Sequence, residues 1–112
     1  MAIIAYLDID QGSDFTATFE LENDDGTPMN LTGYQVYSQF RKSYGSNIGY
    51  SFNASKAIGS NSSVVLSLPG MTSSTIRPGR YLYDIEIISQ AGNKTRIVEG
   101  ILTINPEITR IP

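Results

Sequence analysis

The sequence contains no cysteine, no histidine and no tryptophan. Without cysteine, the chain can form neither disulfides nor thiolate zinc sites, and it has no thiol nucleophile. Without histidine, a serine–histidine–aspartate triad is excluded, and a serine nucleophile would need a lysine as its base. No Ser-x-x-Lys motif occurs that could supply one. We therefore expect a protein that is not an enzyme and that binds no cofactor.

Long apolar runs and clustered positive charge are also missing. No stretch approaches the roughly 20 apolar residues of a membrane helix, and the N-terminus lacks the basic segment of a secretory signal. Eight basic residues stand against 11 acidic ones, a net charge of −3, and Arg41-Lys42 is the only basic pair. Phosphate backbones are bound by clustered Lys and Arg. Neither a nucleic acid nor a membrane is therefore an expected partner.

The length and the apolar content indicate one small globular domain. The chain has 112 residues, of which 40% are hydrophobic, and single domains commonly have about 100–150 residues. Pro106 should stop the last strand, because proline cannot donate a backbone hydrogen bond to a sheet. We therefore expect one domain over residues 1–105 and an extended C-terminal tail over residues 106–112.

Apolar and polar residues alternate along most of the chain, and turn residues interrupt the alternation. This pattern is typical of an all-β protein. No segment of ten or more residues has helical periodicity, so two antiparallel sheets should pack against each other. A single helical turn is predicted over residues 71–76, with Thr72 as its N-cap. The expected strands cover residues 3–9, 15–22, 34–41, 50–57, 63–68, 81–88 and 94–104.

One motif specifies the kind of sandwich. Pro78-Gly79-Arg80-Tyr81 resembles the corner before the sixth strand of immunoglobulin-like domains, where a tyrosine hydroxyl bonds back to the backbone of the corner. Tyr81 would be this corner tyrosine. Tyr83 stands where antibody domains have a cysteine, so packing would replace the disulfide between the sheets. The predicted fold is an immunoglobulin-like antiparallel β-sandwich of about seven strands.

The last predicted hairpin has apolar residues at outward positions. By the alternation, Leu82 and Ile88 point away from the core, as do Ile97 and Ile101, and Tyr37 lies on a neighbouring strand of the same sheet. Several exposed apolar side chains together can exceed the patch that a soluble monomer usually leaves bare. We predict that this face mediates docking or self-assembly. Alternatively, the N-terminal run or the tail covers it.

The tyrosines allow a second hypothesis. Tyr37 points outward, while Tyr44 and Tyr50 flank a glycine-bearing loop, and together they could form a platform that binds a sugar or a peptide. The absence of tryptophan makes this a lean set for stacking on sugar rings. The alternative is that Tyr50 enters the core. A carbohydrate- or cell-surface-binding module is therefore the second function considered.

The acidic residues give only weak indications of a metal site. Asp8, Asp10 and Asp14 lie close together in the sequence, but a calcium site needs six to eight oxygen ligands, and the same residues also suit a plain turn. We expect no metal site. Three further carboxylates, at positions 84, 86 and 99, are predicted to be surface charges, paired with Arg41 or Lys94.

Four segments together resemble a known group of proteins: residues 10–15, 26–34, 77–85, and 96–104 with 106–110. Their order and spacing are similar to those of small virion-associated sandwich proteins of tailed bacteriophages, including marine T4-like phages. The N-terminal sandwich of siphophage upper baseplate proteins is similar more loosely. The resemblance implies a virion structural protein of the tail, the baseplate or the capsid surface, assembled in the host cytoplasm. Its partners would be other virion proteins or further copies of itself, and no active site is implied.

Overall fold

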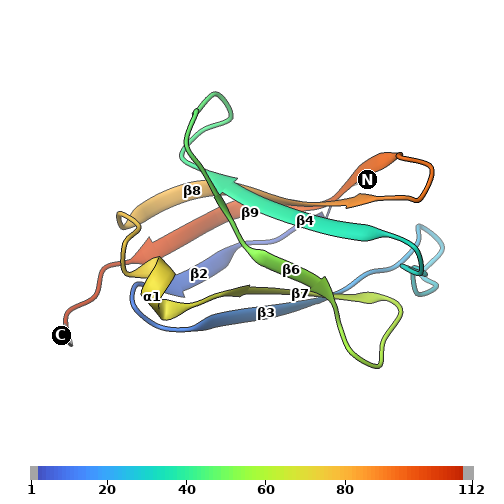
Figure 1. Cartoon of the computed structure of the whole chain (residues 1–112), viewed down its shortest axis with the longest axis horizontal. Helices are drawn as coiled ribbons and strands as arrows, with labels where there is room; N and C mark the ends of the chain where they lie inside the picture. The colour runs from blue at the N-terminus through green and yellow to red at the C-terminus, as the bar shows by residue number, and fades with distance from the viewer. Residues whose placement is uncertain (1–2, 110–112) are drawn as a thin grey trace.

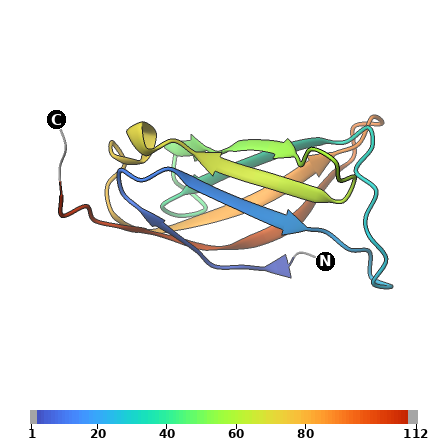
Figure 2. The same cartoon turned by 90° about the horizontal axis from the view of Figure 1, so that it is seen from below.

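Two β-sheets pack face to face in the computed structural model, which describes residues 3–109 (Figures 1 and 2). The larger sheet has the strand order β1-β9-β8-β4-β5, with β2 also paired to β9, and the smaller one has the order β3-β7-β6. The elements are β1 (Ile3–Ile4), β2 (Leu7–Asp10), β3 (Phe15–Glu20), β4 (Gln35–Arg41), β5 (Gly49–Ser51), β6 (Asn53–Lys56), β7 (Ser63–Leu68), α1 (Gly70–Ser73), β8 (Gly79–Ile88) and β9 (Lys94–Asn105). The predicted immunoglobulin-like sandwich with one helical turn is confirmed. Within residues 3–109, no helix has the length and apolar character needed to cross a membrane.

The core lies between the inner faces of the two sheets. On β8 every second side chain is buried, namely Tyr81, Tyr83, Ile85 and Ile87, as the alternation predicts. Leu66 and its neighbours on β7 close the core from the smaller sheet. Each such side chain stabilises the fold by about 1.5–3 kcal/mol when it is fully buried.

Aromatic rings fill the part of the core next to β5. The ring of Phe40, which has no exposed surface, lies 5.2 Å from Tyr50, 5.0 Å from Phe52 and 5.5 Å from Tyr81 between ring centroids. The contact with Tyr81 is edge to face, an arrangement that aromatic pairs prefer. Phe40 is thus the centre of the aromatic packing that joins the two sheets.

The predicted tyrosine corner is present. The hydroxyl of Tyr81 donates a hydrogen bond of 2.5 Å to the carbonyl of Arg77, four residues earlier. Tyr83, at the position of the antibody cysteine, packs its ring against Phe52 with 6.5 Å between centroids. Its hydroxyl donates to the carbonyl of Ala5 over 2.8 Å. Aromatic packing therefore stands where antibody domains have a disulfide, and the hydroxyl of Tyr83 ties β8 to the N-terminal segment of the same sheet.

The predicted strand over residues 3–9 is divided into β1 and β2, and both pair with β9 in parallel. Between them, the carbonyl of Ala5 turns to the hydroxyl of Tyr83 and approaches the Cα of Gly100. Any side chain at position 100 would collide with this carbonyl. Gly100 is therefore the residue that lets the N-terminal segment come so close to β9.

Residues 50–57 also form two strands where the sequence predicts one. β5 belongs to the larger sheet and β6 to the smaller one, and buried Phe52 lies at the crossing. The amide of Phe52 donates to the carbonyl of Ser38, 3.0 Å away. A chain that changes sheets in this way keeps an alternating sequence, so the pattern could not reveal the division.

The end of the sandwich near α1 is held by side chains that bond to backbone groups. Asp14 accepts a hydrogen bond of 2.7 Å from the amide of Gly70, so the predicted capping role of Thr72 is wrong: Thr72 lies inside the helix. The amide of Glu107 donates to Gln11 over 3.1 Å, just after β9 ends. Residues 110–112 of the predicted tail lie outside the described residues.

Candidate functional site

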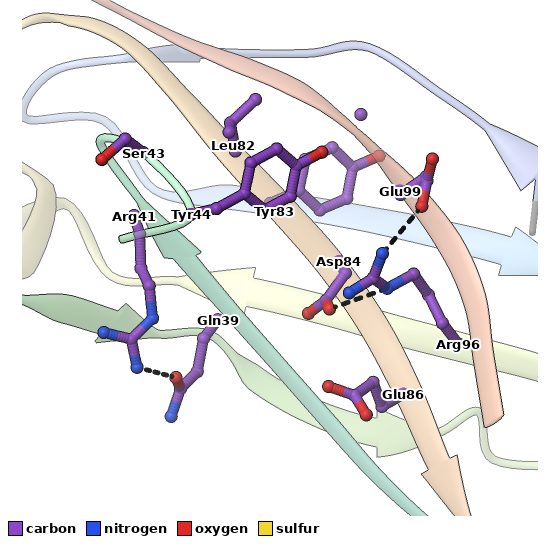
Figure 3. A pocket seen from close by; sticks show the side chains of 11 residues that line it. Gln39, Arg41, Ser43, Tyr44, Leu82, Tyr83, Asp84, Glu86, Arg96 and Glu99 are labelled. Carbon is purple, nitrogen blue, oxygen red and sulfur yellow. Dashed lines mark hydrogen bonds and ion pairs between the residues drawn. The ribbon is translucent and has the colours of Figure 1, made fainter. Parts of the chain in front are cut away.

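The outer face of the larger sheet carries a groove lined by residues of β4, β8 and β9 and by the loop after β4 (Figure 3). Register places the outward side chains of β8 between those of its two neighbours: Asp84 pairs with Gln39 on one side and with Glu99 on the other. The groove encloses about 300 Å³, which is at the lower end of the range for small-molecule sites. Its lining consists of Gln39, Arg41, Ser43, Tyr44, Leu82, Tyr83, Asp84, Glu86, Arg96, Glu99 and Gly100.

A second hollow continues the groove along β8. It encloses about 310 Å³ and shares Gln39, Asp84 and Glu86 with the first. From these shared residues it extends to Tyr37 and Ile88. The two hollows together form one groove with a polar centre and an apolar or aromatic side chain at each end.

Arg96 holds two of the carboxylates on one side of the groove. Its Nε donates to Oδ2 of Asp84 over 3.1 Å, and its Nη1 donates to Oε2 of Glu99 over 3.1 Å (Figure 3). The expected partners of these carboxylates, Arg41 and Lys94, are therefore wrong. Surface ion pairs of this kind contribute about 0–1 kcal/mol to stability, so this network does more to orient the side chains than to stabilise the fold.

Arg41 lies across the groove and bonds to the chain beside it. Its Nη2 donates to Oε1 of Gln39 and its Nη1 to the carbonyl of Ser46, each over 3.0 Å. These bonds hold the loop between β4 and β5, which carries exposed Tyr44 at the rim of the groove. The loop side of the groove is thus positioned by Arg41.

The carboxylate of Asp84 has a perturbed pKa. Partial burial raises its pKa, and the negative charge of Glu86, two residues along the same face of β8, raises the pKa further. The positive charge of Arg96 and its hydrogen bond lower the pKa of Asp84. Asp84 and Glu86 are therefore close enough to repel each other, and of the two only Asp84 forms an ion pair within residues 3–109.

The predicted apolar face is wrong at Ile97, which is only 5% exposed and belongs to the core. The register shifts between Ile85 and Glu86, which pair with Val98 and Arg96, and Ile97 is the extra residue of a β-bulge. The bulge turns two consecutive residues of β9 inward, which a strict alternation cannot anticipate.

The remaining residues of the predicted apolar face are on the outer side of the sheet. Leu82, Ile88 and Ile101 are half-buried, and Tyr37 is exposed. The charged centre of the groove separates Leu82 from Ile88.

The three tyrosines of the predicted platform do not come together. Tyr50 pairs with Phe40 on the inner face of the sheet and stacks on its ring, so the alternative placement of Tyr50 is the correct one. Tyr37 and Tyr44 are on the outer side, in different hollows of the groove. Only Tyr44 and Tyr37 remain available for a ligand.

The clustered aspartates near the N-terminus do not converge on one point. Asp8 and Asp10 are exposed on β2, and Asp14 bonds to the amide of Gly70. Among residues 3–109, no group of three acidic side chains is arranged to hold a metal ion.

Sequence reasoning missed Gln39 and Arg96 as members of a site. Gln39 is at an outward position of a predicted strand, so its facing direction was available from the alternation. The facing of Arg96 was not available, because alternation with buried Val98 places Arg96 on the inner face and the bulge at Ile97 turns it outward. That they face Asp84 depends on strand order and register, which the sequence pattern does not specify.

No protein-family model matches the chain, and no curated protein sequence is similar to it. Among solved structures, the internalin-like protein lmo2027 of Listeria monocytogenes is similar with a TM-score of 0.49 and 18% sequence identity, over 93% of this chain and 28% of that one. The chain thus spans little more than a quarter of the internalin-like protein. CopC from Methylosinus trichosporium OB3b is similar with a TM-score of 0.49 and 11% identity, over 94% of this chain and 90% of that one. Neither likeness bears on function.

Proposed function

We propose that this protein is a non-enzymatic structural module of a tailed-phage particle, in the tail or baseplate or on the capsid surface, and that it works by protein–protein assembly. The observation that carries the proposal is the apolar character of the N-terminal edge, which we define as Ile3, Ile4 and Tyr6. The side chains of Ile4 and Tyr6 are 66% and 73% exposed.

Among the described residues, the N-terminal edge is a sheet edge that no lysine, proline or covering segment protects. Within residues 3–109, β1 pairs with β9 on one side and with no strand on the other. Natural proteins protect such edges with lysine, proline or a covering segment, because unpaired backbone groups are a template for another chain. Here the edge carries large apolar side chains. These properties favour the addition of a strand or an apolar surface from a partner.

The motifs that resemble phage sandwich proteins have structural roles in this chain. Gly26 adopts a positive φ of 86° in the turn after Asp25, and Leu31 is completely buried. Tyr81 forms the corner, and Gly100 admits the N-terminal segment. None of these residues supplies a reactive group, which supports a scaffold role over a chemical one.

The first experiment asks whether the chain is part of a particle. Phage particles are purified on a density gradient from a lysate whose genome encodes this chain, and their tryptic peptides are identified by mass spectrometry. We expect peptides of this protein at a constant ratio to those of the major virion proteins across the particle band. Peptides that are found only in the soluble fraction would refute the proposal.

The second experiment asks whether the N-terminal edge mediates assembly. Ile4→Lys adds the type of charge that blocks edge pairing, and Ile58→Lys is the matched control, because Ile58 is a fully exposed isoleucine in a loop. Both variants should fold, as both side chains are exposed. We expect Ile4→Lys to be lost from purified particles, or from oligomers in sedimentation velocity, while Ile58→Lys behaves like the parent chain. Equal incorporation of the two variants would exclude the edge as the assembly surface.

A further inference from the structure

The centre of the groove has an excess of negative charge. The residues common to both hollows are Gln39, Asp84 and Glu86, two carboxylates and one neutral amide. Arg41 lines only the first hollow and Lys94 only the second, so the two cations are at opposite ends. Arg96 is already shared between Asp84 and Glu99, and within residues 3–109 Glu86 takes part in no ion pair.

The neighbouring carboxylates of Asp84 and Glu86 repel each other, and partial burial of Asp84 removes some of the water that would screen this repulsion. A cation bound between the two would relieve the repulsion and pair with Glu86. A metal ion suits the centre poorly, because calcium needs six to eight oxygen ligands and magnesium needs octahedral geometry. A cationic group on an organic side chain has the size and the charge that the centre can accept.

The ends of the groove indicate what surrounds that cation. Leu82 and Tyr44 line one end, and Ile88 and Tyr37 line the other. Leu82 and Ile88 are six residues apart on β8, which is about 20 Å at the rise of an extended strand. An extended peptide of about seven residues has this length, and its alternate side chains would face the groove.

We propose that the groove binds an extended segment of a partner protein, with an arginine or lysine side chain between Asp84 and Glu86 and apolar side chains at the two ends. This inference rests on the proposed assembly function and names the chemistry of one partner. The guanidinium or ammonium group complements the charge of the centre, and the apolar side chains complement Leu82 and Ile88. Charge complementarity of this kind mainly provides specificity and register.

The test uses two synthetic seven-residue peptides, acetyl-Ile-Ser-Arg-Ser-Ser-Ser-Leu-amide and the same peptide with citrulline in place of arginine. Citrulline keeps the shape of arginine and removes its charge. Each peptide is titrated into the isotope-labelled full chain and followed by the NMR shifts of the backbone amides. We expect the arginine peptide to shift the amides of Gln39, Tyr44 and Glu86, and to bind about fivefold more tightly than the citrulline peptide.

A pair of variants assigns the effect to the groove. Glu86→Gln removes the unpaired charge and should abolish the preference for arginine over citrulline. Glu20→Gln is the matched control, since Glu20 is an exposed glutamate on β3 of the other sheet, and it should leave the preference unchanged. Both variants should keep the melting temperature of the parent chain, because both side chains point to solvent or to the open groove.

Three outcomes would overturn the inference. Equal binding of the two peptides would show that charge is irrelevant, and no shift with either would show that the groove binds no such segment. Shifts of the same amides by methyl glucoside or calcium chloride, but by neither peptide, would assign the groove to a carbohydrate or a metal ion. None of these outcomes bears on particle incorporation, which depends on the N-terminal edge and is tested with Ile4→Lys.

Discussion

The two faces of β8 differ in how completely the polar groups of their side chains are paired with a partner. On the inner face, Tyr81 and Tyr83 are buried, and each hydroxyl has a backbone acceptor. On the outer face, Asp84 shares one guanidinium with Glu99, and Glu86 has no ion pair among residues 3–109. A closed inner face determines stability, whereas an open outer face with unmatched charge is free to bind a partner. The predictions below test this division of roles.

The largest effect is expected at the centre of the inner face. Phe40→Ala removes a ring that contacts three other aromatic rings and should destabilise the protein by about 3–5 kcal/mol. Gln39→Ala, one residue away on the outer face, should change stability by less than about 0.5 kcal/mol. Urea unfolding followed by circular dichroism measures both. Similar losses for the two variants would contradict the division between the faces.

The bulge on β9 gives a second pair of variants. Ile97→Ala empties a buried site and should cost about 3 kcal/mol. Ile101→Ala removes a half-buried side chain of the outer face and should cost about 1 kcal/mol or less. For both variants, the change in the free energy of unfolding is calculated from the shift of the urea midpoint at a constant denaturant slope. If Ile101 proved the more costly of the two, Ile97 would be on the outer face, and the bulge would be misplaced.

Ile97 also shows how far the sequence could predict this fold. Strict alternation on β8 correctly placed all eight residues from Tyr81 to Ile88, because that strand has no bulge. On β9 the same rule held from Val98 to Ile104 but failed at Arg96 and Ile97, since a bulge adds one residue to one strand and reverses the facing of the residues before it. The tyrosine corner was predictable because its residues are close together in the sequence.

The groove was harder to predict than the core for a physical reason. Burial depends mainly on the apolar character of each residue, which is known from the residue type. The contact of Arg96 with Asp84 depends on the register between β8 and β9, and a one-residue shift would pair other charges. Similarly, the distance between Tyr50 and Tyr37 depends on which face of the sheet each occupies. Individual roles were therefore predictable, whereas the charge pairing was not.

A smaller effect is expected where the N-terminal segment meets the sheet. Gly100→Ala places a Cβ against the carbonyl of Ala5 and should cost about 2 kcal/mol, because the backbone of the N-terminal segment must move. Gly45→Ala is the control, since a Cβ there meets nothing and the backbone is not in the left-handed region. Hydrogen exchange should show faster exchange at the amide of Ala5 in the first variant only. Unchanged protection in Gly100→Ala would mean that this close approach does not hold the N-terminal edge in place.

The smallest effect concerns the one inner-face hydroxyl that reaches the edge of the sheet. Tyr83→Phe removes its hydrogen bond to Ala5 and should cost about 1 kcal/mol at neutral pH.

The same hydroxyl should make stability depend on pH. Burial raises the pKa of Tyr83 from 10.0 to about 12, so the folded chain keeps this proton over a pH range in which the unfolded chain loses it. The stability that comes from Tyr83 is thus complete below pH 10 and is lost as the pH rises towards 12. The parent chain should lose more stability over this range than Tyr83→Phe, while Tyr37→Phe, on the outer face, should follow the parent. If the parent chain and Tyr83→Phe lost equal stability over this pH range, the phenol of Tyr83 would be exposed to water. The inner face would then be open to solvent at its edge.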